Sequence, residues 1–252
     1  KPFAGVNGSG KHNNWSLGTD NGVNLFKPGK EPNKNLQFLC VLACLMEAVN
    51  KHALLLRAAA SNTGNDHRLG ANEAPPAIIS IYMGDQLGEI VDAIVAGVPF
   101  DQLPCAEVGT LDLGVSTLPV LPKDPTDRNR TSPFAFTGNR FEFRMVASSV
   151  SIGDANTVMN SMIAESFNKA CDALEGAEDF EKAAIDYIYK TMKENKNIVF
   201  NGNGYSDEWV EEAAKRGLPN VKSIVDAIPA YTDESSIEMF EKLGVMTKRE
   251  LE

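Results

Sequence analysis

The sequence is poor in the residues that mark secreted, zinc-binding or nucleic-acid-binding proteins. Among 252 residues there are only four cysteines and three histidines, and the cysteine spacing matches no zinc motif. Acidic residues outnumber basic ones by 34 to 24, which gives a formal net charge of −10. Because phosphate backbones and acidic membranes attract basic patches, this balance argues against nucleic acid and membrane partners. No apolar run approaches the roughly 20 residues that span a bilayer.

The few cysteines also indicate a cellular compartment. Cys40 and Cys44 lie on one face of an apolar helical pattern, which predicts buried thiols. A reducing, cytoplasmic location is therefore expected. The composition, 43% hydrophobic and 23% charged, is that of a globular chain with a sizeable core. The chain opens without an initiator Met directly onto a loop, so we expect either a fragment of a longer polypeptide or a processed product.

What is present at the start is a glycine-rich loop that leads into a histidine. Gly5, Gly8 and Gly10 precede His12 within a few residues. Glycine lets the backbone approach a ligand closely, and successive N–H groups can line an anion site. The loop therefore indicates either a small anion held beside a metal or a solvated surface turn, and the residues alone leave both open.

One motif in this loop is a decoy. Residues 5–11 spell the phosphate-binding pattern G-x-x-x-x-G-K, but His12 stands where Ser or Thr should hold Mg²⁺. That motif also needs a buried strand before it and a helix after it. Neither is present in the sequence pattern, so a nucleotide-switch NTPase is the disfavoured interpretation.

Hydrophobic periodicity predicts an α+β fold. We expect antiparallel strands in part of a curved, barrel-like sheet, backed by one long helix over 36–61, with a C-terminal helical region packed outside. His52, inside that helix, is expected to be a hydrogen-bonded structural residue. Residues 1–150 would hold the sheet and the long helix, with an insertion at about 84–127, and 151–252 would form a helical region. The other expected elements are strands within 14–26, a strand at 77–82, and helices at 84–97, 153–174, 177–194, 206–216, 221–228, 232–243 and 247–252.

Two further stretches carry candidate chemistry. Glu73 precedes Ala-Pro-Pro on a stiffened loop near Arg68, which fits an acid/base group or a surface ion pair. Arg140, Glu142 and Arg144 alternate with two phenylalanines, so a strand would place all three charges on one face. That face is either a solvated strand edge or a polar interior that holds a metal and phosphates.

Three stretches, which follow one another in the family's order, resemble glutamine synthetases. Their residue patterns most resemble those of the type III bacterial branch. Residues 7–16 resemble the ATP-site signature, 68–75 the active-site flap, and 128–130 with 140–144 the phosphate-binding arginines and last metal-binding strand. The resemblance covers about residues 1–150 by motif, and it implies that they form the C-terminal part of a glutamine-synthetase-like catalytic domain. It implies ATP-dependent condensation of L-glutamate with ammonia to L-glutamine through a γ-glutamyl phosphate.

The resemblance also implies roles for individual residues. His12 and Glu142 would bind Mg²⁺ or Mn²⁺, while Glu73 would take a proton from ammonium, and Arg144 would act in catalysis and in glutamate binding. The glutamate-binding set would be Asn7, Gly8, Arg68, Glu73 and Arg144. The ATP-binding set would be Asn14, Ser16, Arg130 and Arg140.

The family's other metal-binding carboxylates are not found in this chain. We therefore expect an incomplete active site and an isolated chain without activity. The alternatives are a ligase for a related amine or acid, and a non-catalytic glutamine-synthetase-like subunit. By resemblance, the partners are ATP, glutamate and ammonium, within a homo-oligomer that is a dodecamer of two hexameric rings.

Overall fold

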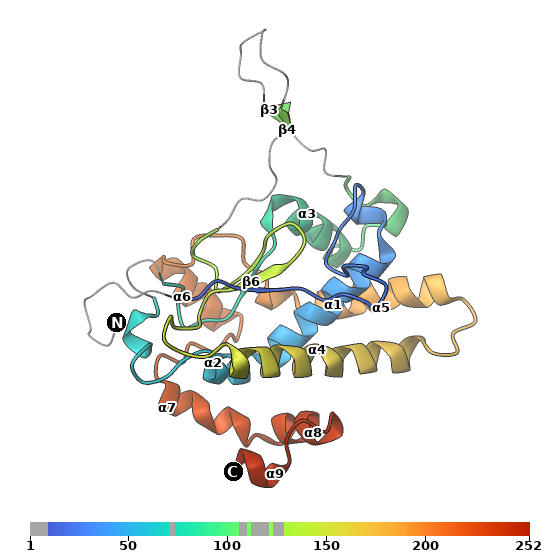
Figure 1. Cartoon of the computed structure of the whole chain (residues 1–252). Coiled ribbons are helices and arrows are strands. Elements are labelled where there is room, and N and C mark those ends of the chain that lie inside the picture. Colours follow the sequence, from blue (N-terminus) through green and yellow to red (C-terminus); the bar gives the residue numbers. More distant parts are fainter. Residues whose placement is uncertain (1–9, 71–73, 106–109, 112–120, 123–128) are drawn as a thin grey trace.

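A computed structural model describes residues 10–70, 74–105, 110–111, 121–122 and 129–252. The fold is α+β, as predicted: a small open sheet with helices packed against it, followed by a helical C-terminal region (Figure 1). The structural statements below concern these described residues alone. Asn7, Gly8 and Glu73, three of the predicted site residues, lie outside them.

The sheet has four strands in the order β1-β6-β5-β2. β1 (Asn13–Trp15) pairs antiparallel with β6 (Phe141–Phe143), and β6 pairs antiparallel with β5 (Phe134–Phe136). β2 (Ile81–Tyr82) pairs parallel with β5, so the sheet is mixed at this end rather than antiparallel throughout. The sheet does not close into a barrel within the described part of the chain.

One face of the sheet is aromatic and forms the core. Phe134, Phe136, Phe141 and Phe143 are all buried. The rings of Phe134 and Phe141 stack with centroids 5.2 Å apart, and Phe38 of α1 (Leu36–Lys51) packs on Phe136 at 6.2 Å. The predicted alternation in β6 is therefore confirmed, because its phenylalanines face the helices.

The predicted single helix over 36–61 is wrong in one respect. The chain forms α1 and α2 (Ala53–Ala59), which meet at His52 with a bend of 74°. His52 leaves helical geometry, with φ −108° and ψ 23°, and its buried ring lies 2.7 Å from Glu165. His52 is thus the structural residue that was expected, and it marks the bend. No single described helix is long and apolar enough to cross a membrane, although the bent pair meets that test by length and composition.

The C-terminal helices share the core of the sheet. α4 (Gly153–Leu174) and α5 (Phe180–Glu194) form a helical hairpin beside α1 (Figure 1). Met162 and Ile188 from this pair belong to the same buried cluster as Phe141. One continuous core therefore joins both halves of the chain, and the helices expected outside the catalytic part pack directly against it.

The remaining elements are short. The helix expected at 84–97 is α3 (Gly84–Val95). The described residues of the stretch 98–127 include a 3₁₀ turn, Phe100–Gln102, and an antiparallel pair β3 (Thr110–Leu111) and β4 (Leu121–Pro122). Other 3₁₀ turns are Pro32–Lys34, Asp66–Arg68, Lys196–Ile198 and Ile228–Tyr231. The last helices are α6 (Asp207–Lys215), α7 (Ile224–Ala227), α8 (Glu234–Lys242) and α9 (Lys248–Leu251).

Candidate active site

The register of β1 and β6 brings the predicted metal-binding residues together. Asn14 lies directly opposite Glu142 in the ladder. Directly opposed residues point to the same face of a sheet, as do residues two positions apart on one strand. His12 directly precedes β1 and Arg144 directly follows β6, and both contact the Glu142 side chain, which lies on the face opposite to the aromatic core.

Glu142 is the centre of this arrangement. One of its carboxylate oxygens lies 2.6 Å from Nδ1 of His12. The other accepts hydrogen bonds from Nη2 of Arg144 at 2.7 Å and from Nε at 2.9 Å. Glu142 and Arg144 are 7% and 6% exposed, whereas the His12 side chain is 68% exposed. The strand is interior and its carboxylate is buried, so the solvated-edge interpretation is wrong for Glu142 and Arg144.

The electrostatics keep this carboxylate ionised. Burial alone raises the pKa of Glu142, because it disfavours the charged form. The hydrogen bonds and charge of Arg144, with a smaller contribution from His12, outweigh burial and lower the pKa below its ordinary value. The site thus presents a buried, negatively charged oxygen pair next to an exposed imidazole.

Arg144 is held rigidly by the segment before β5. Its Nη1 donates to the carbonyl of Asn129 and, at 3.4 Å, to that of Ser132. Asn129 lies in the arginine-rich turn, and its side chain in turn donates to the Gly202 carbonyl at 2.7 Å. The sequence pattern indicated the arginines of this turn as site residues. In the structure, Arg144 is instead contacted by the backbone carbonyl of Asn129, which lies between those arginines.

Arg68 reaches the glycine loop that carries His12. Its Nε donates to Asn65 Oδ1 and its Nη2 to the Met145 carbonyl, both at 2.6 Å. A Cβ added at Gly10 would lie 2.7 Å from Nη1 of Arg68. The glycine is therefore needed for the close approach of backbone and guanidinium. Burial lowers the pKa of Arg68, and the nearby Tyr205 acts in the opposite direction.

Tyr205 is a neighbour of the site that the sequence did not indicate. Besides its effect on Arg68, its hydroxyl lies 3.5 Å from the Arg130 carbonyl. The segment before it docks on the arginine-rich turn, where Gly204 N donates to Thr131 Oγ1 at 2.7 Å. A tyrosine after a polar turn has no sequence signal for such a position, because the contact depends on the packing of two distant segments.

The predicted ATP-binding residues take no part in the contacts that join His12, Glu142 and Arg144. Asn14, Ser16, Arg130 and Arg140 are all exposed. The Asn14 side chain donates to the His12 carbonyl at 3.2 Å. Arg140 precedes β6 and is not part of the strand, so the three predicted charges do not share one buried face. Whether these four side chains bind a nucleotide stays a prediction.

The lysine of the phosphate-binding pattern, Lys11, is bound to backbone carbonyls of the chain itself. Its amino group donates to the carbonyls of Ala147, Ser148 and Val150. Its backbone N–H donates to the Val146 carbonyl at 2.8 Å. The lysine is thus engaged by the chain that leads into α4, and no buried strand–loop–helix unit surrounds it in the described residues.

The donor set fits a divalent cation only in part. An imidazole nitrogen and a carboxylate suit Mg²⁺ or Mn²⁺ less specifically than a set of carboxylates does. The described residues contain no group of three or more His, Cys, Asp or Glu side chains arranged for a metal. Both Glu142 oxygens are already engaged, so coordination by His12 and Glu142 together requires their 2.6 Å contact to open. Further ligands are needed to complete a site.

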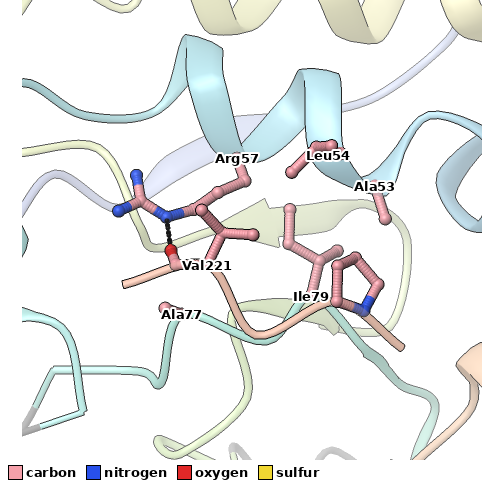
Figure 2. A pocket seen from close by; sticks show the side chains of 7 residues that line it. Ala53, Leu54, Arg57, Ala77, Ile79 and Val221 are labelled. Atoms are coloured by element: carbon pink, nitrogen blue, oxygen red, sulfur yellow. Dashed lines mark hydrogen bonds between the residues drawn. The ribbon is translucent and has the colours of Figure 1, made fainter. Parts of the chain in front are cut away.

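A separate hollow lies under α2 and is not this site. It is lined by the apolar side chains of Ala53, Leu54, Ile79 and Val221, and by Arg57, whose Nε donates to the Val221 carbonyl at 2.8 Å (Figure 2). The hollow leaves no room for a water molecule. It is a packing gap between α2 and the segment before α7.

Comparison with known proteins assigns the class. The family model described as the glutamine synthetase C-terminal domain matches residues 183–252. The chain is 47% identical over 253 residues to a protein named glutamine synthetase from Butyrivibrio fibrisolvens, with all of this chain and 35% of the relative covered. It is 48% identical over 255 residues to the "Type-3 glutamine synthetase" of Dictyostelium discoideum, with all of this chain and 34% of the relative covered.

A third relative agrees with these two. A glutamine synthetase of Bacteroides fragilis (strain YCH46) is 48% identical over 240 residues, with 94% of this chain and 33% of the relative covered. The chain belongs to the glutamine synthetase family, which confirms the resemblance found in its motifs. It spans about a third of the length of the curated relatives it matches.

Proposed function

We propose that this chain supplies part of the active site of an ATP-dependent ligase that condenses L-glutamate with ammonia. The observation that carries the proposal is the ionised Glu142 carboxylate, which is held between His12 and Arg144 on the polar face of the sheet. Family membership supports the same reaction. Phosphoryl transfer between two anions requires cations where negative charge accumulates, and this site combines a guanidinium with two candidate metal ligands.

The proposed reaction has two steps. An oxygen of the glutamate side-chain carboxylate forms a bond to the γ-phosphorus of ATP, and ADP leaves. The nitrogen of ammonia then forms a bond to the acyl carbon. Phosphate leaves with the electron pair of the acyl C–O bond and takes up the proton that the nitrogen loses as it becomes an amide. Glu73 would take the proton that ammonium must lose before its nitrogen can attack.

Each residue has one proposed task in this scheme. A divalent cation, Mg²⁺ or Mn²⁺, would offset the charge of the ATP phosphates when bound, and His12 and Glu142 would contribute to holding it. Arg144 would bind the carboxylate and the phosphoryl group in transfer. Glutamate would be bound by Asn7, Gly8 and Arg68, and ATP by Asn14, Ser16, Arg130 and Arg140.

We further propose that the site is completed by residues beyond this chain. Two candidate ligands are fewer than a divalent cation needs. The isolated chain should therefore release no phosphate from ATP in the presence of glutamate, ammonium and Mg²⁺. The complete polypeptide should do so, with glutamine formed in equal amount. Turnover by the isolated chain would overturn the two-part site.

A non-catalytic subunit is the second candidate, and one observation favours it: the described residues hold no three-ligand metal cluster. Calorimetric titration of the complete polypeptide with ATP separates the two. A catalytic subunit should bind ATP in a manner that depends on Mg²⁺, whereas a decayed subunit should show no such dependence. If binding is seen, a panel of amines in place of ammonium distinguishes glutamine synthesis from a related ligation.

The assembly and the location are also proposals. By family membership, the complete protein would form a homo-oligomer, a dodecamer of two hexameric rings, which sedimentation velocity would test. The four cysteines are free thiols, with Cys105 and Cys171 exposed. Exposed free thiols are compatible with a reducing compartment, which supports a cytoplasmic location.

A further inference from the structure

The strand β1, which His12 directly precedes, is tied to the C-terminal helical region by its other side. Asn13 Nδ2 donates to Asn156 Oδ1, and Trp15 Nε1 donates to Asn160 Oδ1, both at 2.9 Å. The Lys11 amino group binds the carbonyls just before α4, as described above. Lys11, Asn13 and Trp15 thus all contact the segment 147–160.

The alternation of the strand separates two sets of residues. Lys11, Asn13 and Trp15 point toward α4 or its approach, and Asn13 and Trp15 are buried. His12, Asn14 and Ser16 lie at the intervening positions and are exposed. Successive side chains of a strand point to opposite faces. The contacts that fix Asn13 and Trp15 therefore also fix the direction in which His12 and its alternate neighbours point.

The spacing of the two bonds matches the geometry of both elements. Asn156 and Asn160 are four residues apart on α4, so they lie on one face about 6 Å apart along the axis. Asn13 and Trp15 are two residues apart on a strand, a separation of about 6.6 Å. The two elements can therefore bond at both positions at once only in one register.

β1 needs such an anchor. It has three residues, lies at the end of the sheet order and, within the described part of the chain, pairs with β6 alone. A slip of one residue would exchange the faces, which would turn Asn13 toward the site and His12 away from it. Ladder hydrogen bonds by themselves specify register weakly on so short a strand.

We propose that Asn156 and Asn160 of α4 are positioning residues that set the register of β1 and thereby hold His12 against Glu142. In this proposal, α4 determines the position of β1 in the sheet. The effect on catalysis rests on the proposed function, whereas the effect on the strand does not.

The test uses the complete polypeptide and two paired changes in α4. N156D/N160D retains both oxygen acceptors, while N156L/N160L removes them at similar side-chain volume. N168L on the exposed side of the same helix is the matched control. We expect N156L/N160L to lower kcat/KM for ATP by about 10-fold to 100-fold, as misplaced catalytic groups do. N156D/N160D and N168L should stay within about threefold of the unchanged protein, by the same scale.

A second pair of variants tests the contact from the strand side. W15F removes the indole N–H that Asn160 accepts. W209F removes an indole N–H that is buried and has no hydrogen-bond partner among the described residues. W15F should weaken ATP binding and W209F should not, which a general loss of a large ring would not produce. Equal effects of the two would overturn the proposal.

Hydrogen exchange separates this inference from the proposed function. The amides of Asn14 and Trp15 should exchange faster in N156L/N160L than in N168L, even if the protein proves to be catalytically inactive. Equal exchange in both, with equal kinetics, would overturn the positioning role. If the double change prevents folding, N160L alone provides the same comparison.

Discussion

Nδ1 of His12 lies 2.6 Å from a carboxylate oxygen of Glu142, although the two residues are far apart in the sequence. His12 directly precedes β1 and Glu142 lies in the neighbouring strand β6, so the register of these two strands brings the two side chains together. This contact is the geometric feature on which the ligase interpretation depends. Its role in holding a metal is the proposal that the following experiments test.

Removal of the charge of Glu142 should lower both the stability of the fold and the activity of the complete enzyme. E142Q keeps an oxygen acceptor for Arg144 but leaves the buried guanidinium without a counter-charge. We expect the free energy of unfolding to fall by about 2 kcal/mol and activity of the complete enzyme to fall by at least about 100-fold. Urea unfolding and a glutamine assay measure the two effects. E31Q, in an exposed ion pair, is the control, and retained turnover in E142Q would refute the assignment.

The contact between Gly10 and Arg68 predicts a substrate-specific defect. The Cβ of G10A would displace the Arg68 guanidinium, which is fixed by Asn65 and Met145. If Arg68 binds glutamate, KM for glutamate should rise by about 10-fold or more, because one charge-assisted contact is lost, while KM for ATP changes little. G18A, whose Cβ meets only ordinary contact at 3.7 Å, should behave as the unchanged enzyme. A uniform change in both KM values would argue against this role of Arg68.

The Glu165 carboxylate predicts a pH-dependent contribution to stability. Burial raises its pKa, but hydrogen bonds from His52 and Lys51 outweigh burial and lower the pKa to about 2. The folded-state pKa lies below the unfolded-state value, so the stabilisation is complete above about pH 4.5 and is lost as pH falls toward 2. Its size is about 3 kcal/mol.

E165Q should therefore be less stable than the unchanged chain at pH 6, and the difference should shrink as pH falls below 4.5. Urea unfolding at pH 6, 4.5 and 3.5 measures this, with E178Q on an exposed loop as the baseline. A difference that stays constant over this range would show that the carboxylate does not act through its charge.

Arg57 should be one of the most sensitive positions for stability. It is 1% exposed and donates to the carbonyls of Val221 and Lys222 and to Asp66. R57M leaves these acceptors without their donor and Asp66 without its counter-charge, so the free energy of unfolding should fall by about 3–5 kcal/mol. R249M, on exposed α9, should change it by less than about 0.5 kcal/mol. A loss below about 1 kcal/mol for R57M would contradict the structural role.

Much of the fold could be predicted because local patterns and tertiary packing agree. The amphipathic pattern of α3 and the alternation of Phe141 and Phe143 both match the structure. The bend at His52 could not be predicted, because the apolar pattern continues through it. Its position coincides with the contact to Glu165 on another helix, which periodicity within one segment cannot reveal.

The candidate site also combines residues that the sequence predicted with contacts that it did not predict. Motifs nominated His12, Glu142 and Arg144, and the structure brings these three together. The parallel pairing of β2, the proximity of Tyr205 and the bonds from Asn13 and Trp15 to α4 depend on contacts between distant segments. Side chains of ordinary type carry no sign of such contacts in a single sequence.

The most direct test of the central claim is calorimetric titration of the complete polypeptide with ATP, with and without Mg²⁺, in the unchanged protein, H12A and E142Q. We predict tight binding that requires Mg²⁺ in the unchanged protein and loss of the Mg²⁺ dependence in both variants. Binding that depends on Mg²⁺ to the same extent in all three proteins would contradict the account, because His12 and Glu142 would then not hold the metal.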